Sequence, residues 1–219
     1  MIKCCIFDLD GTLLNTLSTI THYLNGALKS NGIEPISREA CQKYVGNGAR
    51  KLILRALKEK EIEDELTFNK VFSDYNEAYD ADPFYLTEPY EKVYELLSTL
   101  ASHGVALAVL SNKPDFATRS AISHFFKDKF KLVCGARDGV ALKPMPDGVF
   151  EILTELGFTP DECAYIGDSD VDVLTGKAAG VSKNIAVSWG FRSLEELRAA
   201  GAEIITNSVD ELLSKILEP

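Results

Sequence analysis

The sequence predicts an α/β protein in which a doubly wound parallel sheet is interrupted by an all-helical insertion. The sheet is predicted by an apolar run at the N-terminus and, after Asp82-Pro83, by a regular alternation of short apolar runs with helical patterns. The insertion is predicted by residues 16–80, which space their apolar side chains as a helix does and contain no convincing strand. We therefore expect residues 1–15 and 83–219 to form one core domain and residues 16–82 to form a helical cap domain.

The predicted elements of the core follow one another in a regular order. The continuous apolar run at residues 105–110 is typical of a parallel strand that is covered on both faces. Two predicted helices are followed by Gly157 and Gly180, and glycine commonly ends a helix. Further strands are expected near residues 131–134, 164–166, 184–187 and 203–205. Helices are expected at residues 93–100, 116–125, 149–156, 171–179, 194–199 and 209–217.

Composition and charge restrict the functional classes open to this chain. Its 219 residues carry a formal net charge of −10, which argues against a nucleic-acid partner because phosphates require a basic face. No apolar run approaches the roughly 20 residues of a membrane span, and the N-terminus does not have the pattern of a signal peptide. We expect a cytoplasmic protein without a membrane or nucleic-acid partner, and a monomer is the default expectation.

The most informative residues are two aspartates at the end of the first strand. Asp8 and Asp10 are separated by one residue, so in a strand their side chains project to the same side. They would lie at the carboxyl end of the strand, where open α/β sheets bind ligands. Two close carboxylates repel each other unless a cation or a shared proton relieves them. The turn therefore predicts an enzyme with a metal ion, a proton-transfer step, or both.

Three further polar elements lie at or just beyond the ends of predicted strands. Ser111-Asn112-Lys113 follows the run at 105–110, Lys143 lies in a loop with two prolines, and Asp168 and Asp172 follow the strand at 164–166. The carboxyl ends of parallel strands converge on one crevice. We therefore expect these groups, which are distant in sequence, to share one site with the two N-terminal aspartates.

These residue types suit phosphoryl transfer. Asp8 can attack phosphorus and carry an aspartyl-phosphate, while Asp10 can protonate the leaving alkoxide and later activate water. Lys143 and the Ser111 hydroxyl can bind phosphate oxygens and the charge that develops on them. Mg²⁺ is the expected cofactor because it prefers a few carboxylates together with substrate oxygens, and Asp168 supplies a further carboxylate.

Each element taken alone has an ordinary structural explanation. An Asp-x-Asp pair is usually part of a surface turn, and Lys143 beside prolines would normally be a solvated loop lysine. Asp168 and Asp172 near a helix start can act as a cap and as charges that favour the helix dipole. What favours a common site is the occurrence of all the elements together, in order, each at a strand end.

In this order the elements resemble the four motifs of the haloacid dehalogenase superfamily, over essentially the whole chain. The motifs are carried by Asp8-x-Asp10-Gly11-Thr12, Ser111, Lys143 and Gly167-Asp168-x-x-x-Asp172. The resemblance implies a Rossmann-like core, a helical cap after the first motif, and Mg²⁺-dependent phosphoryl transfer from a small phosphate ester. Asp8 would be the nucleophile and Asp10 the acid/base, and the presence of this second aspartate disfavours dehalogenation.

The resemblance also implies roles for the remaining residues. Mg²⁺ would be held by the Asp8 carboxylate, the Asp10 backbone carbonyl and Asp168, with assistance from Asp172. Lys143 counts as both catalytic and substrate-binding. The other substrate-binding residues expected in the core are Gly11, Thr12, Ser111 and Asn112.

The insertion carries a segment, residues 43–50, that resembles the cap loop of phosphoglycolate phosphatase-type enzymes. Gly46 and Gly48 allow close backbone approach, and Asn47 and Arg50 can bind a small polar or anionic substrate. A tight turn between two helices, followed by a solvated arginine, explains the same residues equally well.

Three functions remain open on this basis. The first is a phosphomonoester hydrolase, with phosphoglycolate as one candidate substrate. The second is a phosphomutase of the β-phosphoglucomutase type, which would use the same residues and return the phosphoryl group to a sugar. The third is a phospho-receiver domain, which also combines a phosphorylated aspartate with a Mg²⁺ site but needs neither Asp10 nor a helical insertion.

Overall fold

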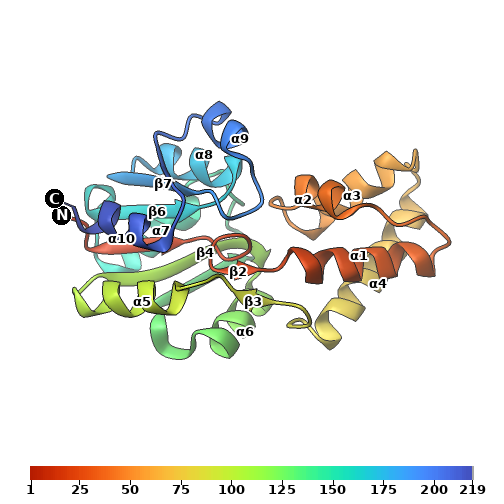
Figure 1. Cartoon of the computed structure of the whole chain (residues 1–219). Helices are drawn as coiled ribbons and strands as arrows, with labels where there is room; N and C mark the ends of the chain where they lie inside the picture. The colour runs from red at the N-terminus through yellow and green to blue at the C-terminus, as the bar shows by residue number, and fades with distance from the viewer. Residues whose placement is uncertain (219) are drawn as a thin grey trace.

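The computed structural model describes residues 1–218, which form an α/β core with a helical lobe beside it (Figure 1). Within these residues the main sheet has six strands in the order β5-β4-β1-β6-β7-β8, and all neighbouring pairs are parallel. The strands are β1 (Cys4–Phe7), β4 (Ala106–Pro114), β5 (Leu132–Ala136), β6 (Cys163–Gly167), β7 (Lys183–Val187) and β8 (Ile204–Thr206). The predicted parallel α/β core is confirmed.

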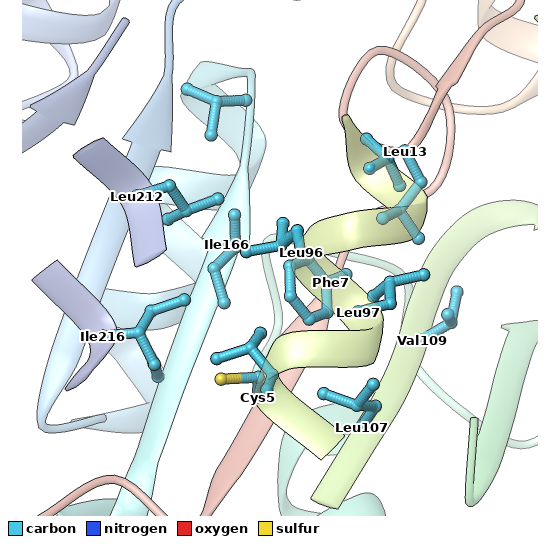
Figure 2. Packing of buried hydrophobic residues seen from close by; sticks show 14 of the residues in the cluster. Cys5, Phe7, Leu13, Leu96, Leu97, Leu107, Val109, Ile166, Leu212 and Ile216 are labelled. Carbon is cyan, nitrogen blue, oxygen red and sulfur yellow. The ribbon is translucent and has the colours of Figure 1, made fainter. Parts of the chain in front are cut away.

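Helices cover both faces of this sheet. They are α5 (Val93–Ser102), α6 (Asp115–Phe125), α7 (Asp147–Leu156), α8 (Asp170–Ala179), α9 (Leu194–Ala199) and α10 (Val209–Leu217). Successive residues of β1 alternate between the faces. Cys5 and Phe7 pack with side chains of α5 and α10, as Figure 2 shows, while Cys4 and Ile6 belong to a second buried cluster with α7. Burial on both faces is the reason that the strands are continuous apolar runs.

The position of β1 determines where the sheet binds ligands. β1 lies between β4 and β6, so the chain leaves it toward one edge of the sheet and later returns to its other side. This reversal is a topological switch point, and open sheets bind ligands at the carboxyl ends of the strands beside it. The carboxyl ends of β1, β4 and β6 therefore border the expected crevice.

The helical lobe has its own buried cluster. Its helices are α1 (Leu17–Ser30), α2 (Arg38–Tyr44), α3 (Ala49–Glu59) and α4 (Glu65–Ala81). Leu24, Ile53 and Val71 are fully buried at its centre. One core residue, Phe191, packs into this cluster as well. The lobe thus has its own apolar interior, and among the described residues only one aromatic side chain of the core packs into it.

The two chain segments that join lobe and core pair with each other. They form β2 (Leu14–Asn15) and β3 (Glu88–Pro89), which are antiparallel. The sequence pattern does not predict this ribbon, because two-residue strands are too short to produce a periodic pattern. Close to the ribbon, the Thr19 hydroxyl donates to the Tyr85 carbonyl at 2.6 Å and so ties α1 to the returning segment.

One predicted element has a different extent. Ser111-Asn112-Lys113 was expected to follow a strand, but β4 continues through these residues to Pro114. The extension depends on β5, because Pro114 pairs with Ala136 after a register shift beyond Leu110.

Among residues 1–218, none of the helices combines the length and the apolar character that a membrane-spanning helix requires.

Candidate active site

Three aspartates from two neighbouring strand ends form a buried carboxylate cluster. Asp8 directly follows β1, Asp168 directly follows β6, and Asp172 lies in the first turn of α8. The backbone N–H of Asp8 donates to the Ile166 carbonyl at 2.8 Å, which joins the two strand ends. One carboxylate oxygen of each aspartate lies within 4.8 Å of the others, and all three side chains are buried. This close grouping of negative charge needs compensation.

Lys143 provides part of that compensation. Its Nζ lies 2.8 Å from Asp8 Oδ1 and 2.7 Å from Asp172 Oδ1. Asn112 holds the backbone of Lys143, because Asn112 Oδ1 accepts from the Lys143 N–H at 2.9 Å and Asn112 Nδ2 donates to the Lys143 carbonyl at 3.1 Å. The loop that carries Lys143 is therefore fastened to β4, which places the ammonium over Asp8.

Burial and crowding change the protonation of these groups. Burial, followed by the charge of Asp172, raises the pKa of Asp8 well above its ordinary value. The same two causes raise the pKa of Asp168 to about 7. Burial lowers the pKa of Lys143, but the charges of Asp172 and Asp8 outweigh burial and raise it overall. Lys143 thus stays protonated. Its single positive charge does not balance the three carboxylates of the cluster.

The carboxylate cluster fits a hard divalent cation. Buried carboxylate oxygens in excess over nearby ammonium groups are a suitable donor set for such a hard cation. Gly11 and Gly190 leave room for Asp168, since a Cβ at either position would overlap its carboxylate. The Thr12 hydroxyl donates to Asp168 Oδ1 at 3.1 Å and the Phe191 N–H donates to Oδ2 at 2.7 Å, so both oxygens are oriented.

Asp172 differs from Asp168 because each of its oxygens accepts two hydrogen bonds, whereas each Asp168 oxygen accepts one. Oδ1 accepts from Lys143 Nζ and, at 3.2 Å, from the Tyr165 hydroxyl. Oδ2 accepts from the Ser169 hydroxyl at 2.6 Å and from the Ser169 N–H at 3.1 Å. These bonds suit a residue that orients Lys143 better than one that binds a cation directly.

Asp10 is not part of the carboxylate cluster and pairs with Lys113. Lys113 Nζ lies 3.3 Å from each Asp10 carboxylate oxygen and donates to the Tyr79 hydroxyl at 2.6 Å. Burial lowers the pKa of Lys113, but Asp10 and Tyr79 raise it to above its ordinary value. From the sequence, Lys113 is grouped with Ser111 and Asn112 but has no predicted role. Its proximity to Asp10 was not visible because the two residues are 103 positions apart.

A cavity of about 590 Å³ lies between the core and the helical lobe. Side chains of the core and of the lobe both line it. The predicted site residues on its wall are Asp8, Asp10, Gly46, Asn47, Gly48, Arg50, Ser111, Asn112 and Lys143. Gly11, Thr12, Asp168 and Asp172 are not on the wall: Asp172 pairs with Lys143, which is, and Gly11 and Thr12 adjoin Asp168.

Arg192 fastens the lobe to the core, a contact that the sequence does not predict. Its side chain is buried, with Nη1 donating to the Gln42 carbonyl at 2.8 Å and Nη2 to the Val45 carbonyl at 2.7 Å. Its Nε donates to Asp170 Oδ1 at 3.1 Å. Arg192 belongs to the segment that follows β7, at the edge of the sheet where the other site residues lie. Its place after a strand end is the sequence feature that could have identified it.

The predicted binding residues of the lobe have mixed placements. Residues 45–48, here called the lobe loop, border the cavity, and the Gly46 carbonyl accepts from Asn112 Nδ2 at 3.1 Å. Asn47 Oδ1 accepts from Arg55 Nη2 at 2.7 Å, so this oxygen is engaged within the lobe. Arg50 is exposed, and its guanidinium lies 4.5 Å from the centre of the Phe68 ring. It borders the cavity without an ion-pair partner among residues 1–218.

Comparison with known proteins gives consistent results. The profile described as haloacid dehalogenase-like hydrolase matches residues 5–187. A phosphoglycolate phosphatase of Aquifex aeolicus is 33% identical over 190 residues, covering 86% of each chain. One of Rhodospirillum rubrum is 33% identical over 208 residues, covering 92% of this chain and 86% of that one. The crystal structure of a Lactobacillus delbrueckii subsp. bulgaricus protein, provisionally described as a phosphoglycolate phosphatase, superposes with a TM-score of 0.94 at 31% identity and covers 99% of both chains.

Proposed function

The chain belongs to the family of haloacid dehalogenase-like hydrolases, and we propose that it hydrolyses a small phosphomonoester through a phosphorylated Asp8. As a class it is a phosphoric monoester hydrolase. The observation that carries the proposal is the placement of Asp8 on the cavity wall, with Lys143 Nζ at 2.8 Å and a second carboxylate, Asp10, on the same wall. One carboxylate can attack phosphorus while the other handles protons.

The proposed reaction has two halves. In the first, an Asp8 oxygen forms a bond to phosphorus, the ester oxygen leaves, and Asp10 gives that oxygen a proton. In the second, Asp10 takes a proton from water, the water oxygen bonds to phosphorus, and inorganic phosphate leaves Asp8. Lys143 and the Ser111 hydroxyl would bind the phosphate oxygens during both halves, where preorganised donors stabilise developing charge.

Asp8 and Asp168, with the Asp10 backbone carbonyl, are the residues that would hold Mg²⁺. A bound Mg²⁺ would offset the charge of the nucleophile and of the phosphate, which otherwise repel each other. Asp172 would contribute by holding Lys143.

We further propose that residues 16–82 act as a cap over the site. Support comes from the lobe's separate apolar interior and from a cavity wall made by both lobe and core. A cap that closes over substrate excludes water and completes the binding site.

Phosphoglycolate is the first substrate to test. Several relatives are named phosphoglycolate phosphatase, and Arg50 borders the cavity without an ion-pair partner among residues 1–218, which suits the carboxylate of such a substrate.

The test is phosphate release from a panel of phosphoglycolate, sugar phosphates, nucleotides and an aryl phosphate. Wild type, Asp8→Asn and Asp161→Asn are compared with Mg²⁺ and with a chelator. Asp161 is an exposed carboxylate outside the cavity and serves as the matched control. We expect release that needs both Mg²⁺ and Asp8 and is unchanged in Asp161→Asn.

Two results would count against the proposal. Full activity of Asp8→Asn would remove Asp8 from the reaction. Conversion of a sugar phosphate to its isomer without free phosphate would identify a mutase instead.

A further inference from the structure

Lys113 connects the helical lobe to the proposed acid/base residue. It lies on β4, while Tyr79 lies on α4 and Asp10 lies in the turn after β1. Lys113 Nζ donates to the Tyr79 hydroxyl at 2.6 Å and sits 3.3 Å from both oxygens of Asp10. The ammonium also lies 4.7 Å from the centre of the Tyr79 ring. One ammonium group therefore contacts both a side chain of the lobe and the Asp10 carboxylate.

All three side chains are largely buried, and each also borders the cavity. The side chains of Lys113 and Asp10 are only 10% and 16% exposed, and Tyr79 is 7% exposed. An ion pair at this depth is screened little by solvent, and its geometry is well defined compared with that of a surface pair. The pair can therefore hold a carboxylate in one orientation.

Asp10 has little else to orient it. Within residues 1–218, Lys113 is the only group that bonds to the Asp10 carboxylate. Lys113 in turn depends on Tyr79 for its other polar contact. Lys143, by contrast, is held by Asp8 and Asp172, both in the core. The nucleophile is thus oriented by the core alone, whereas the orientation of Asp10 also involves the lobe.

We propose that Lys113 and Tyr79 are positioning residues that aim the Asp10 carboxyl group, in its protonated form, at the leaving oxygen while α4 rests against the core. The inference depends on the proposed function, because it needs Asp10 as the acid. Movement of the lobe away from the core would remove the Tyr79 hydroxyl from Lys113 and release Asp10 from its orientation. Proton transfer would then be efficient only with the cap in place.

The test uses the leaving group to isolate proton donation. An alkoxide leaves poorly unless it is protonated, whereas 4-nitrophenolate leaves without a proton. The ratio kcat/KM reports the steps up to phosphorylation of Asp8. A defect in aiming Asp10 should therefore lower kcat/KM for the best alkyl phosphate of the panel much more than for 4-nitrophenyl phosphate.

Two variants should produce this selective defect. For Lys113→Met we expect kcat/KM to fall by about tenfold or more with the alkyl phosphate and by no more than about twofold with 4-nitrophenyl phosphate, given the size of general acid effects. Tyr79→Phe keeps the ring and should give a smaller loss with the same selectivity. Lys113→Arg keeps the charge and should restore part of the activity.

The matched control is Tyr23→Phe. Tyr23 is also a buried tyrosine of the lobe, but its hydroxyl donates to the Asp82 carbonyl at 2.6 Å and it does not border the cavity. Loss of this hydroxyl removes a hydrogen bond of similar length without touching Lys113. We expect equal relative activity toward the two substrates, whatever the change in thermal stability.

The outcomes separate this inference from the proposed function. If wild type releases no phosphate from any substrate, the proposed function fails. The positioning role is refuted if wild type is active but kcat/KM of Lys113→Met and Tyr79→Phe falls equally for both substrates. It is also refuted if kcat/KM falls for neither. If Lys113→Met does not fold, Tyr79→Phe alone decides, since it removes a single oxygen atom.

Discussion

At the scale of single residues, the site is organised by which carboxylate oxygens are already bonded. Asp172 uses both oxygens on Lys143, Tyr165 and Ser169. Asp8 has Lys143 as an ion-pair partner and borders the cavity. Similar carboxyl groups, a few ångströms apart, are thus suited to different tasks. Neighbouring donors, and not residue type, would distinguish the proposed supporting residue, Asp172, from the proposed nucleophile, Asp8.

Gly11 is the residue whose replacement tests the Asp168 position most directly. Its φ is +93°, and a Cβ there would overlap the Asp168 carboxylate. For Gly11→Ala we expect activity to fall by about tenfold or more, because groups that support a metal ligand typically have effects of this size. The positive φ should also lower the free energy of unfolding by about 1–2 kcal/mol. Activity at several Mg²⁺ concentrations and urea unfolding measure the two effects.

Gly139→Ala is the control for backbone strain. Gly139 has a similar φ of +81°, but a Cβ there would meet nothing within 4 Å. It should lose comparable stability and keep full activity. Equal loss of activity in the two variants would show that displacement of Asp168 is not the cause.

At the scale of elements, the lobe loop is held from the core by groups on two different segments. Asn112 on β4 donates to the Gly46 carbonyl, and Arg192, after β7, donates to the Val45 carbonyl. The segment with Arg192 also reaches the carboxylate cluster, because the N–H of Phe191 donates to Asp168. The position of the lobe loop and the orientation of Asp168 are therefore linked through two consecutive residues.

Arg192→Ala should release the lobe loop. Two hydrogen bonds from a buried guanidinium to lobe carbonyls would be lost, which should lower the free energy of unfolding by about 2–3 kcal/mol. We expect KM to rise several-fold with a smaller change in kcat, since the loop borders the cavity and not the Asp8 oxygens. Steady-state kinetics and urea unfolding measure both quantities. Arg198→Ala, which removes an exposed arginine nearby, should change neither, and a similar change there would contradict the assignment.

At the scale of the whole molecule, the site lies where two separately packed bodies meet. Core and lobe each have a buried apolar cluster, and the contacts between them near the cavity include polar bonds from Arg192, Asn112 and Lys113. Water can replace hydrogen bonds of this kind at a modest cost in free energy, whereas exposing an apolar interior to water costs much more. The architecture is therefore suited to opening between the bodies while each keeps its fold.

Cation binding should stabilise the whole fold. A ligand that binds only the folded state raises the melting temperature by mass action. We expect Mg²⁺ to raise the Tm of wild type and of Asp161→Asn, and a chelator to reverse the rise. Asp168→Asn should lose most of the rise, because it removes a carboxylate from the cluster. Calorimetry measures this without substrate, and a full Mg²⁺ response in Asp168→Asn would exclude Asp168 as a ligand.

The sequence by itself determined the alternation of strands and helices, the helical insertion, and the strand ends that bring Asp8 and Asp168 together. Local periodicity and parallel-sheet geometry are sufficient for these inferences. It did not determine that β4 extends to Pro114, since that extension depends on pairing with β5.

Only the tertiary structure decided which polar groups meet at the site. Lys113 bonds to Tyr79 across 34 residues, Asn112 to Lys143 across 31, and Arg192 to Val45 across 147. No periodic pattern encodes such contacts, because they depend on how the lobe is seated on the core and on which donors each buried carboxylate or carbonyl finds there. The proposed catalytic residues are therefore predictable from strand ends, while the residues proposed to orient Asp10 and the lobe loop are not.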